Sequence, residues 1–310
     1  MTSAAKTPIV VGLDGSDSAV TAALWAAAEA TRGGAPLHLC VALRWPEGHH
    51  FADTPLPDQA ERQLLANAKG WLDEAESAVR LAGVSVPIST EVMLQGAVEM
   101  LVQASTTARM VVVGSRGLGG FEGLLLGSTA IGVTAGAVGP VVVVRGEQTR
   151  TIGPVVVGID SSTGSDAALE FALDAAVSRA TDLVVLHTWH DAMVPYAREP
   201  LLVDWSQVRR GEQDGLRERL TALRARHPEV SVQLTVTRDQ AARGLVAQSR
   251  TAQLLVVGSR GRGPVLGWFL GSTSQTLVRH AACPVAVVSG SGSPSAPAPQ
   301  PAVAAASTRS

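Results

Sequence analysis

The chain has 310 residues, of which 46% are hydrophobic, 4% aromatic and 17% charged. This length is twice the usual domain size of about 150 residues, and the hydrophobic share argues against wholesale disorder. The 25 Lys and Arg against 27 Asp and Glu lack the basic excess typical of nucleic-acid-binding proteins, and two cysteines cannot build a disulfide-stapled domain. Because neither a signal peptide nor an apolar run of about 18 residues appears, we expect a cytoplasmic protein with no membrane span.

The first half of the chain alternates between apolar runs and helical patterns. We expect strands at 9–13, 37–43, 85–93, 110–113 and 141–144. We expect helices at 19–31, 59–82, 98–105 and 128–137. Several strands are near-continuous runs of Val, Ile and Leu, which is typical of a parallel sheet covered by helices on both faces. The predicted fold class is therefore α/β.

The second half repeats the first. Residues 10–16 (VVGLDGS) match 156–162 (VVGIDSS), and residues 111–117 (VVVGSRG) match 255–261 (LVVGSRG). A repeated unit of this length is a duplicated domain, since the repeats of solenoids are much shorter. We expect a disordered N-terminus at 1–7, one domain at 8–147, a second at 153–289, and a disordered tail rich in Ser, Pro and Ala at 290–310.

The fourth strand of each half is followed by the pattern Gly-x2-Gly-x9-Gly-Ser-Thr. Its residues are Gly114, Gly117, Gly127, Ser128 and Thr129 in the first half, and Gly258, Gly261, Gly271, Ser272 and Thr273 in the second. Glycines let backbone N–H groups approach a phosphate closely, and a helix N-terminus beside them adds free N–H groups and a positive dipole end. The alternative is that the glycines only shape a tight loop and the serine only caps the helix. The identical spacing in two copies favours an anion site.

An aspartate follows the first strand of each half, at Asp14 and Asp160. Each could be a helix N-cap, with Ser16 or Ser162 sharing the task. Ligands of open α/β sheets bind at the carboxyl ends of the strands, where the strand order reverses. If strands one and four are neighbours there, each carboxylate faces the glycine-rich loop, where it could hold ribose hydroxyls, an adenine amine or a divalent ion.

These motifs, with the Val-Gly-x-Asp first strand and a closing Pro-Val-x-Val-Val strand, resemble the universal stress protein family in its ATP-binding branch. The tandem arrangement, the Ser-Arg-Gly-x-Gly loop and an Arg-Asp-x-x-Ala-Arg segment at 238–243 are similar to the tandem-domain members of mycobacteria and related actinobacteria. The resemblance implies two five-stranded parallel sheets of order 3-2-1-4-5, Rossmann-like and similar to the adenine nucleotide alpha hydrolases. It also implies ATP across the ends of strands one, two and four, with Mg²⁺ bridging the phosphates as an option.

The resemblance assigns the same roles to equivalent residues of both halves. The implied ATP-binding residues of the first half are Gly12, Asp14, Ala42, Val113, Gly114, Gly117, Gly127, Ser128 and Thr129. Those of the second half are Gly158, Asp160, Thr188, Val257, Gly258, Gly261, Gly271, Ser272 and Thr273. Ala42 and Thr188 have no sharp motif to anchor their alignment.

No catalytic motif accompanies the expected nucleotide sites. Both halves lack a P-loop lysine, and the glycine pattern follows strand four, whereas a Rossmann hydride-transfer site has it after strand one. The first hypothesis is therefore an ATP-binding stress-response regulator. The alternatives are a slow ATPase, a protein that phosphorylates itself at a hydroxyl such as Ser128 or Ser272, and a nucleotide-free scaffold.

The last strand of each half, 141–144 and 285–288, is short and apolar. An unpaired strand of this kind at a sheet edge invites pairing with another strand. The resemblance implies that the two halves meet there as a pseudo-dimer, and a further homodimer of two chains stays open. The alternative is an edge strand that some other segment covers.

Overall fold

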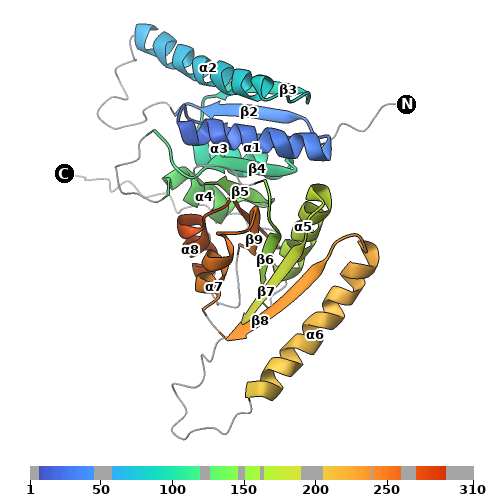
Figure 1. Ribbon diagram of the computed structural model, residues 1–310. Helices are drawn as coiled ribbons and strands as arrows, with labels where there is room; N and C mark the ends of the chain where they lie inside the picture. The colour runs from blue at the N-terminus through green and yellow to red at the C-terminus, as the bar shows by residue number, and fades with distance from the viewer. Residues whose placement is uncertain are drawn as a thin grey trace, which may run out of the picture.

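The computed structural model describes residues 7–44, 58–118, 126–145, 151–160, 164–189, 205–238, 240–259 and 270–290. The disorder expected at the two ends of the chain concerns residues that lie almost wholly outside these ranges. Figure 1 shows the first half of the chain, in blue to green, beside the second half, in green-yellow to red.

The first half contains the predicted elements, with ends shifted by at most a few residues. They are β1 (Ile9–Leu13), α1 (Asp17–Gly33), β2 (Leu37–Ala42), α2 (Asp58–Leu81), β3 (Ile88–Met93), α3 (Ala97–Ala104), β4 (Met110–Gly114), α4 (Ser128–Gly136) and β5 (Val141–Val144). Helix α1 shows why the sequence folds this way locally. The Ser16 hydroxyl accepts a hydrogen bond from the Ala19 N–H at its start, and Gly34 takes the left-handed conformation that ends it, with φ of 57°.

The second half repeats this order. Its elements are β6 (Val155–Ile159), α5 (Gly164–Arg179), β7 (Leu183–Trp189), α6 (Trp205–Arg226), β8 (Val232–Arg238), α7 (Ala241–Gln248), β9 (Leu254–Gly258), α8 (Ser272–His280) and β10 (Val285–Val288). The two halves therefore have equivalent elements in the same sequence, as the repeat predicts.

The strands form one sheet of order β3-β2-β1-β4-β5-β10-β9-β6-β7-β8. Within each half the order is the expected 3-2-1-4-5, and the paired strands are parallel. Strands β5 and β10 pair antiparallel, with Val142 opposite Ala286, so the two halves share a single ten-stranded sheet. Because this central pairing is antiparallel, the strands of the two halves run in opposite directions. The carboxyl ends of β1 and β4 therefore point the opposite way from those of β6 and β9.

Helices cover both faces of the sheet. One core joins apolar residues of α1, α2, α5 and α6 to one face, and a second core joins those of α3, α4, α7 and α8 to the other. Strand residues alternate between the two cores: Val142 belongs to the first and Val143 to the second. Within the described ranges no helix has both the length and the apolar character needed to cross a membrane.

Candidate functional site

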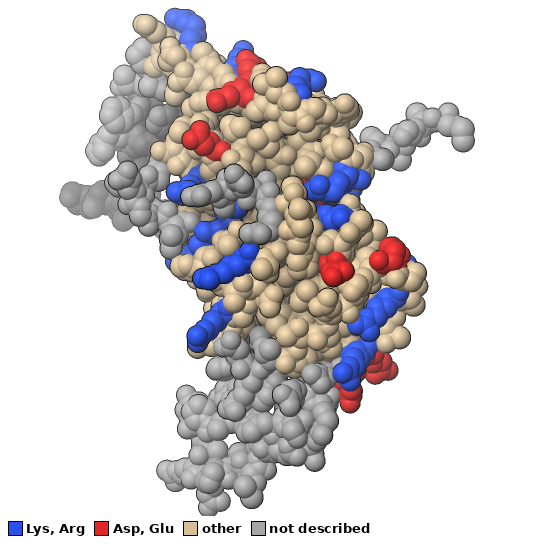
Figure 2. Space-filling model, in the orientation of Figure 1, with Lys and Arg blue, Asp and Glu red and all other residues tan. Residues whose placement is uncertain are grey.

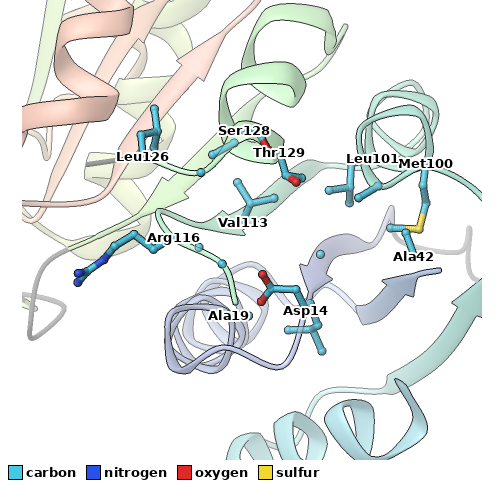
Figure 3. Close-up of a pocket in the computed structure, with 17 residues that line it drawn as sticks. Asp14, Ala19, Ala42, Met100, Leu101, Val113, Arg116, Leu126, Ser128 and Thr129 are labelled. Carbon is cyan, nitrogen blue, oxygen red and sulfur yellow. The ribbon is translucent and has the colours of Figure 1, made fainter. Parts of the chain in front are cut away.

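A cavity of about 290 Å³ lies at the carboxyl ends of β1, β2 and β4. Its walls come from the loop after β1, helix α3, the loop after β4 and the start of α4 (Figure 3). All nine site residues expected in the first half line it: Gly12, Asp14, Ala42, Val113, Gly114, Gly117, Gly127, Ser128 and Thr129. The structure thus brings together residues that are more than 100 positions apart in the sequence. The volume is close to the lower end of the range for ligand pockets, about 300 Å³.

Three of the four glycines in this cavity lie close to other parts of the protein. A Cβ on Gly114 would lie 2.8 Å from the backbone of Ser18, so packing alone explains this glycine. A Cβ on Gly12 would lie 2.8 Å from a methyl group of Leu101 in α3, and one on Gly117 would collide with the Asp14 carboxylate. Both of these contacts are with the ends of side chains, which could shift to admit a Cβ.

Gly127 differs from them. A Cβ there would meet no atom closer than 3.8 Å, and its φ of -72° is accessible to any residue. Gly127 is the N-cap of α4, and no side chain caps that helix. The first N–H groups of a helix lack intrahelical partners, so those at Ser128 and Thr129 border the cavity without a capping oxygen. Ser128 is the first helical residue, which rules out its expected alternative role as the N-cap.

Asp14 joins the two loops that bound the cavity. Its Oδ1 accepts hydrogen bonds from the backbone N–H of Ser16 at 3.1 Å and from the Ser16 hydroxyl at 2.7 Å. Its Oδ2 accepts from the backbone N–H of Leu118 at 3.3 Å. Ser16 caps α1, so Asp14 supports the cap without being the cap. The alternative that Asp14 is itself an N-cap is therefore wrong, and its carboxylate also borders the cavity (Figure 3).

The apolar wall of the cavity comes from residues that the sequence patterns did not single out. Met100 and Leu101 of α3 lie above the ends of β1 and β2, near Ala42, and Leu126 lines the side next to α4 (Figure 3). Such a wall suits the flat face of a ligand ring. Both α3 residues are buried, and apolar residues on a helix usually belong to the core. The one available signal was that Leu101 recurs as Leu245 in the second half.

The second half reproduces the main-chain frame of this site. Gly158 of β6 pairs with Val257 of β9, as Gly12 pairs with Val113 in the first half. A Cβ on Gly158 would lie 2.6 Å from a methyl group of Leu245, which repeats the contact of Gly12 with Leu101. Helix α8 starts like α4, at a glycine N-cap without a capping side chain.

The remaining expected residues of the second half fall into two groups. Those placed at the carboxyl ends of strands or at the start of α8 are Asp160, Thr188, Gly258, Gly271, Ser272 and Thr273. Thr188 lies in β7 opposite Thr237 of β8. Gly261 lies outside the described residues, so the loop between β9 and α8 is described only at its two ends.

Side chains around the two aspartates differ between the halves. Asp160 Oδ1 accepts a hydrogen bond from the Ser165 hydroxyl at 2.7 Å, and Ser165 Oγ accepts one from the Asp160 backbone N–H at 2.8 Å. The position of Ser165 is Ala19 in the first half, and the position of Ser18 is Gly164 in the second. The two sites therefore share a backbone but hold their carboxylates differently.

Both cysteines are core residues. Cys40 and Cys283 are buried and form no disulfide. Burial raises the pKa of the Cys40 thiol to about 12, and Glu91 adds to the shift. Among the described residues, no three His, Cys, Asp or Glu side chains gather into a metal-binding cluster.

Residues 7–145 and 151–289 each match the family model described as the universal stress protein family. A universal stress protein of Mycolicibacterium smegmatis is 38% identical over 300 residues, which covers 92% of this chain and 98% of that relative. One of Mycobacterium tuberculosis is 37% identical and covers 91% of this chain and 96% of its own length. The crystal structure of a universal stress protein from Archaeoglobus fulgidus superposes with a TM-score of 0.70 at 21% identity, over 91% of this chain and 98% of that one. At this identity the structural match supports the fold alone.

Proposed function

Because this chain belongs to the universal stress protein family, we propose that it binds ATP at two sites, one in each half, and acts in the cytoplasm as a nucleotide-dependent stress-response regulator. The sites belong to two domains, at 8–147 and 153–289. One observation carries the proposal. Gly127, whose missing side chain the packing does not require, opens the uncapped start of α4 onto a cavity with one apolar wall.

The chemistry of the lining residues matches the parts of a nucleotide. The adenine would lie against Met100 and Leu101, with the main chain of Ala42 beside it. The Asp14 carboxylate, which lines the cavity with Val113 and Gly114, would accept hydrogen bonds from ribose hydroxyls. A carboxylate suits the ribose better than the phosphates, because it would repel their negative charge.

The phosphates would bind at the other end of the cavity. Backbone N–H groups at the start of α4 and the Ser128 and Thr129 hydroxyls can donate hydrogen bonds to them, and the positive end of the helix dipole favours an anion there. A Mg²⁺ ion that bridges the phosphates would take its ligands from phosphate oxygens and waters, because Asp14 is assigned to the ribose. In the second half the equivalent residues are Gly158, Asp160, Thr188, Val257, Gly258, Gly261, Gly271, Ser272 and Thr273.

Binding and signalling fit the first site better than hydrolysis does. A general base must reach the attacking water with a free lone pair. Asp14 already accepts three hydrogen bonds from the protein, and the proposed ribose contact would occupy its remaining lone pair, so this carboxylate is a poor candidate for the base. The output of the protein would then be its conformation or its surface. Because β5 and β10 pair within one chain, a homodimer would need a surface other than these strands.

The test is to identify and count the nucleotide. We expect mass spectrometry of the purified protein, or calorimetric titration after the nucleotide has been removed, to give two ATP molecules per chain. Release of ADP above a buffer control would favour the slow ATPase, and phosphate found on Ser128 or Ser272 would favour autophosphorylation. If the chain bound no adenine nucleotide, the nucleotide-free scaffold would be the remaining hypothesis.

A further inference from the structure

The side chain of Met100 forms the wall at the base end of the first cavity. Met100 lies in α3, is buried, and lines the cavity with its sulfur beside Ala42 (Figure 3). Side chains of a helix point toward its N-terminus, and α3 begins just after β3, at the carboxyl ends of the strands. The Met100 side chain is therefore directed to the part of the cavity where the adenine is proposed to lie.

The equivalent position in the second half is Gly244, in α7. The next residue of each helix, Leu101 or Leu245, packs on the glycine of the first strand of its half. A Cβ on that glycine would lie 2.8 Å from a leucine methyl group in the first half and 2.6 Å from one in the second. This shared contact aligns α3 with α7 independently of the glycine-rich loops. The second half therefore has no side chain where the first half has Met100.

The strand beneath Gly244 differs as well. Leu186 of β7 occupies the position of Cys40 of β2, since each pairs with the glycine of the neighbouring strand. A Cβ on Gly244 would lie 3.4 Å from a methyl group of Leu186, so the larger strand residue fills part of the space under α7. Leu186 precedes the position of Ala42 by two residues, or about 7 Å along the strand. A leucine side chain does not span that distance, so Leu186 does not replace Met100 at the base end.

A methionine beside a purine ring contributes a sulfur–aromatic contact and buries apolar surface, whereas a glycine contributes neither. We infer that the difference between Met100 and Gly244 makes the first site the tighter of the two, so that ATP fills the sites in order. The inference rests on the proposed function, because it concerns the base of the same nucleotide. Such a chain carries one ATP at low nucleotide concentration and two at high concentration, and its regulatory output has two thresholds.

Surface charge does not set the two halves apart in this way. On the face shown in Figure 2, basic and acidic residues occur on both halves. The side chains that differ around Asp14 and Asp160 concern the proposed ribose contact and do not belong to α3 or α7. Substitutions at Met100 and Gly244 therefore test the base end by itself.

The experiment is a calorimetric titration of the full chain with ATP, which yields two dissociation constants. In the unmodified chain we expect them to differ about tenfold, the upper size of a sulfur–aromatic contact. Met100→Ala should weaken the tighter site about tenfold and leave the other unchanged, and Met100→Leu, which keeps an apolar side chain, should restore most of the affinity. Gly244→Met should strengthen the weaker site by only about threefold, because Leu186 occupies part of the space.

Two matched variants separate this role from packing. Met110→Ala also removes a buried methionine side chain, but Met110 starts β4 and lies at the opposite end of the strands from the cavity. Gly70→Met adds a methionine to α2 at a position where a Cβ would meet nothing within 4 Å. Both variants should leave the two dissociation constants unchanged, whatever their effect on the melting temperature.

The outcomes separate this inference from the proposed function. Equal affinities in the unmodified chain, or a loss of affinity after Met100→Ala no larger than after Met110→Ala, overturn the inference while leaving nucleotide binding intact. A folded Gly244→Met chain whose weaker site is not strengthened overturns it too, and if that chain does not fold, Met100→Ala and Met100→Leu decide the question. If the unmodified chain binds no ATP, the proposed function fails and the inference fails with it.

Discussion

The two halves of the chain share a main-chain frame and differ in the side chains attached to it. After β4, the Ser115 N–H donates to the Val144 carbonyl at 3.0 Å and the Gly127 N–H donates to the Ser115 carbonyl at 2.9 Å. After β9, the equivalent bonds run from Ser259 to Val288 at 2.8 Å and from Gly271 to Ser259 at 2.9 Å. Helices α4 and α8, which follow these loops, both have a glycine N-cap and no capping side chain. By contrast, Ala19 is replaced by Ser165, and Arg145 by Ser289. The duplication has thus kept the backbone of this loop and helix start, while the polar side chains around it have diverged.

The same asymmetry occurs where the halves meet. Glu29 of α1 is only 8% exposed and pairs with Arg179 of α5, which is 4% exposed, at 2.5 Å. Arg32 contacts the same carboxylate, and the Arg179 guanidinium lies 5.9 Å from the Trp25 ring. The positions equivalent to Glu29 and Arg179 are Ala175 and Gly33, so a second copy of this ion pair cannot form. The pair therefore favours contact between unlike halves over contact between like ones.

The largest expected effect comes from breaking this ion pair. Glu29→Ala leaves Arg179 buried without a carboxylate, so we expect the free energy of unfolding to fall by about 3 kcal/mol. Arg179→Ala should cost less, because Glu29 keeps Arg32 as a partner. Chemical denaturation of the full chain measures both.

The control for this pair is Glu76→Ala in α2. Glu76 forms an exposed i,i+4 pair with Arg80, for which we expect a loss of at most about 0.5 kcal/mol. A loss at Glu29 no larger than at Glu76, or a larger loss at Arg179 than at Glu29, contradicts the idea that the contact between the halves depends on this carboxylate.

The next effect separates the ligand role of a glycine from its packing role. Gly127→Ala should weaken ATP binding at the first site about tenfold, because a methyl group would intrude where the phosphates are proposed to bind. Its cost in stability should stay within about 1 kcal/mol, the usual effect at an N-cap. Gly271→Ala should do the same at the second site. Calorimetric titration and thermal unfolding of each variant give both quantities.

Two further glycines calibrate that comparison. Gly114→Ala should destabilise the fold, since its Cβ would lie 2.8 Å from the backbone of Ser18. Gly70→Ala in α2 meets nothing within 4 Å and should leave ATP binding unchanged while stabilising the helix by about 0.5–1 kcal/mol. If Gly127→Ala left ATP affinity equally unchanged, the phosphates would not bind at the start of α4.

The fold and the polar part of the cavity were predictable because periodicity and glycine spacing are local signals. The duplication doubled those signals and made the family resemblance clear. The resemblance in turn implied the strand order and the nine residues around the first cavity, among which Ala42 has no motif of its own. The interpretation of Ser128 as an N-cap was wrong by one residue, since the helix begins at Ser128 and Gly127 is the cap. A shift of this size decides whether N–H groups are satisfied or free.

Other features could not be read from the sequence because they depend on the tertiary structure. Gly12 was assigned to the ligand, but the Leu101 side chain of α3 also packs where its Cβ would lie. Met100 has the pattern of a core residue and lies in the cavity wall. Arg145 follows a strand without any motif, and only the antiparallel pairing of β5 with β10 brings it to α8.

The smallest expected effect concerns the carboxylate of the second site. Ser165→Ala removes the hydroxyl that donates to Asp160 Oδ1, and we expect about 1 kcal/mol lower stability together with weaker ATP binding at the second site only. Ser178→Ala is the matched control on the same helix, since its hydroxyl contacts only the carbonyl of Ala175, at 3.1 Å. Suppose that Ser165→Ala changed stability no more than Ser178→Ala and left the second ATP in place. Asp160 would then not need this serine, just as Asp14 manages with Ala19 at the equivalent position. The two halves would then differ in the side chains around their aspartates but not in how those aspartates serve the nucleotide.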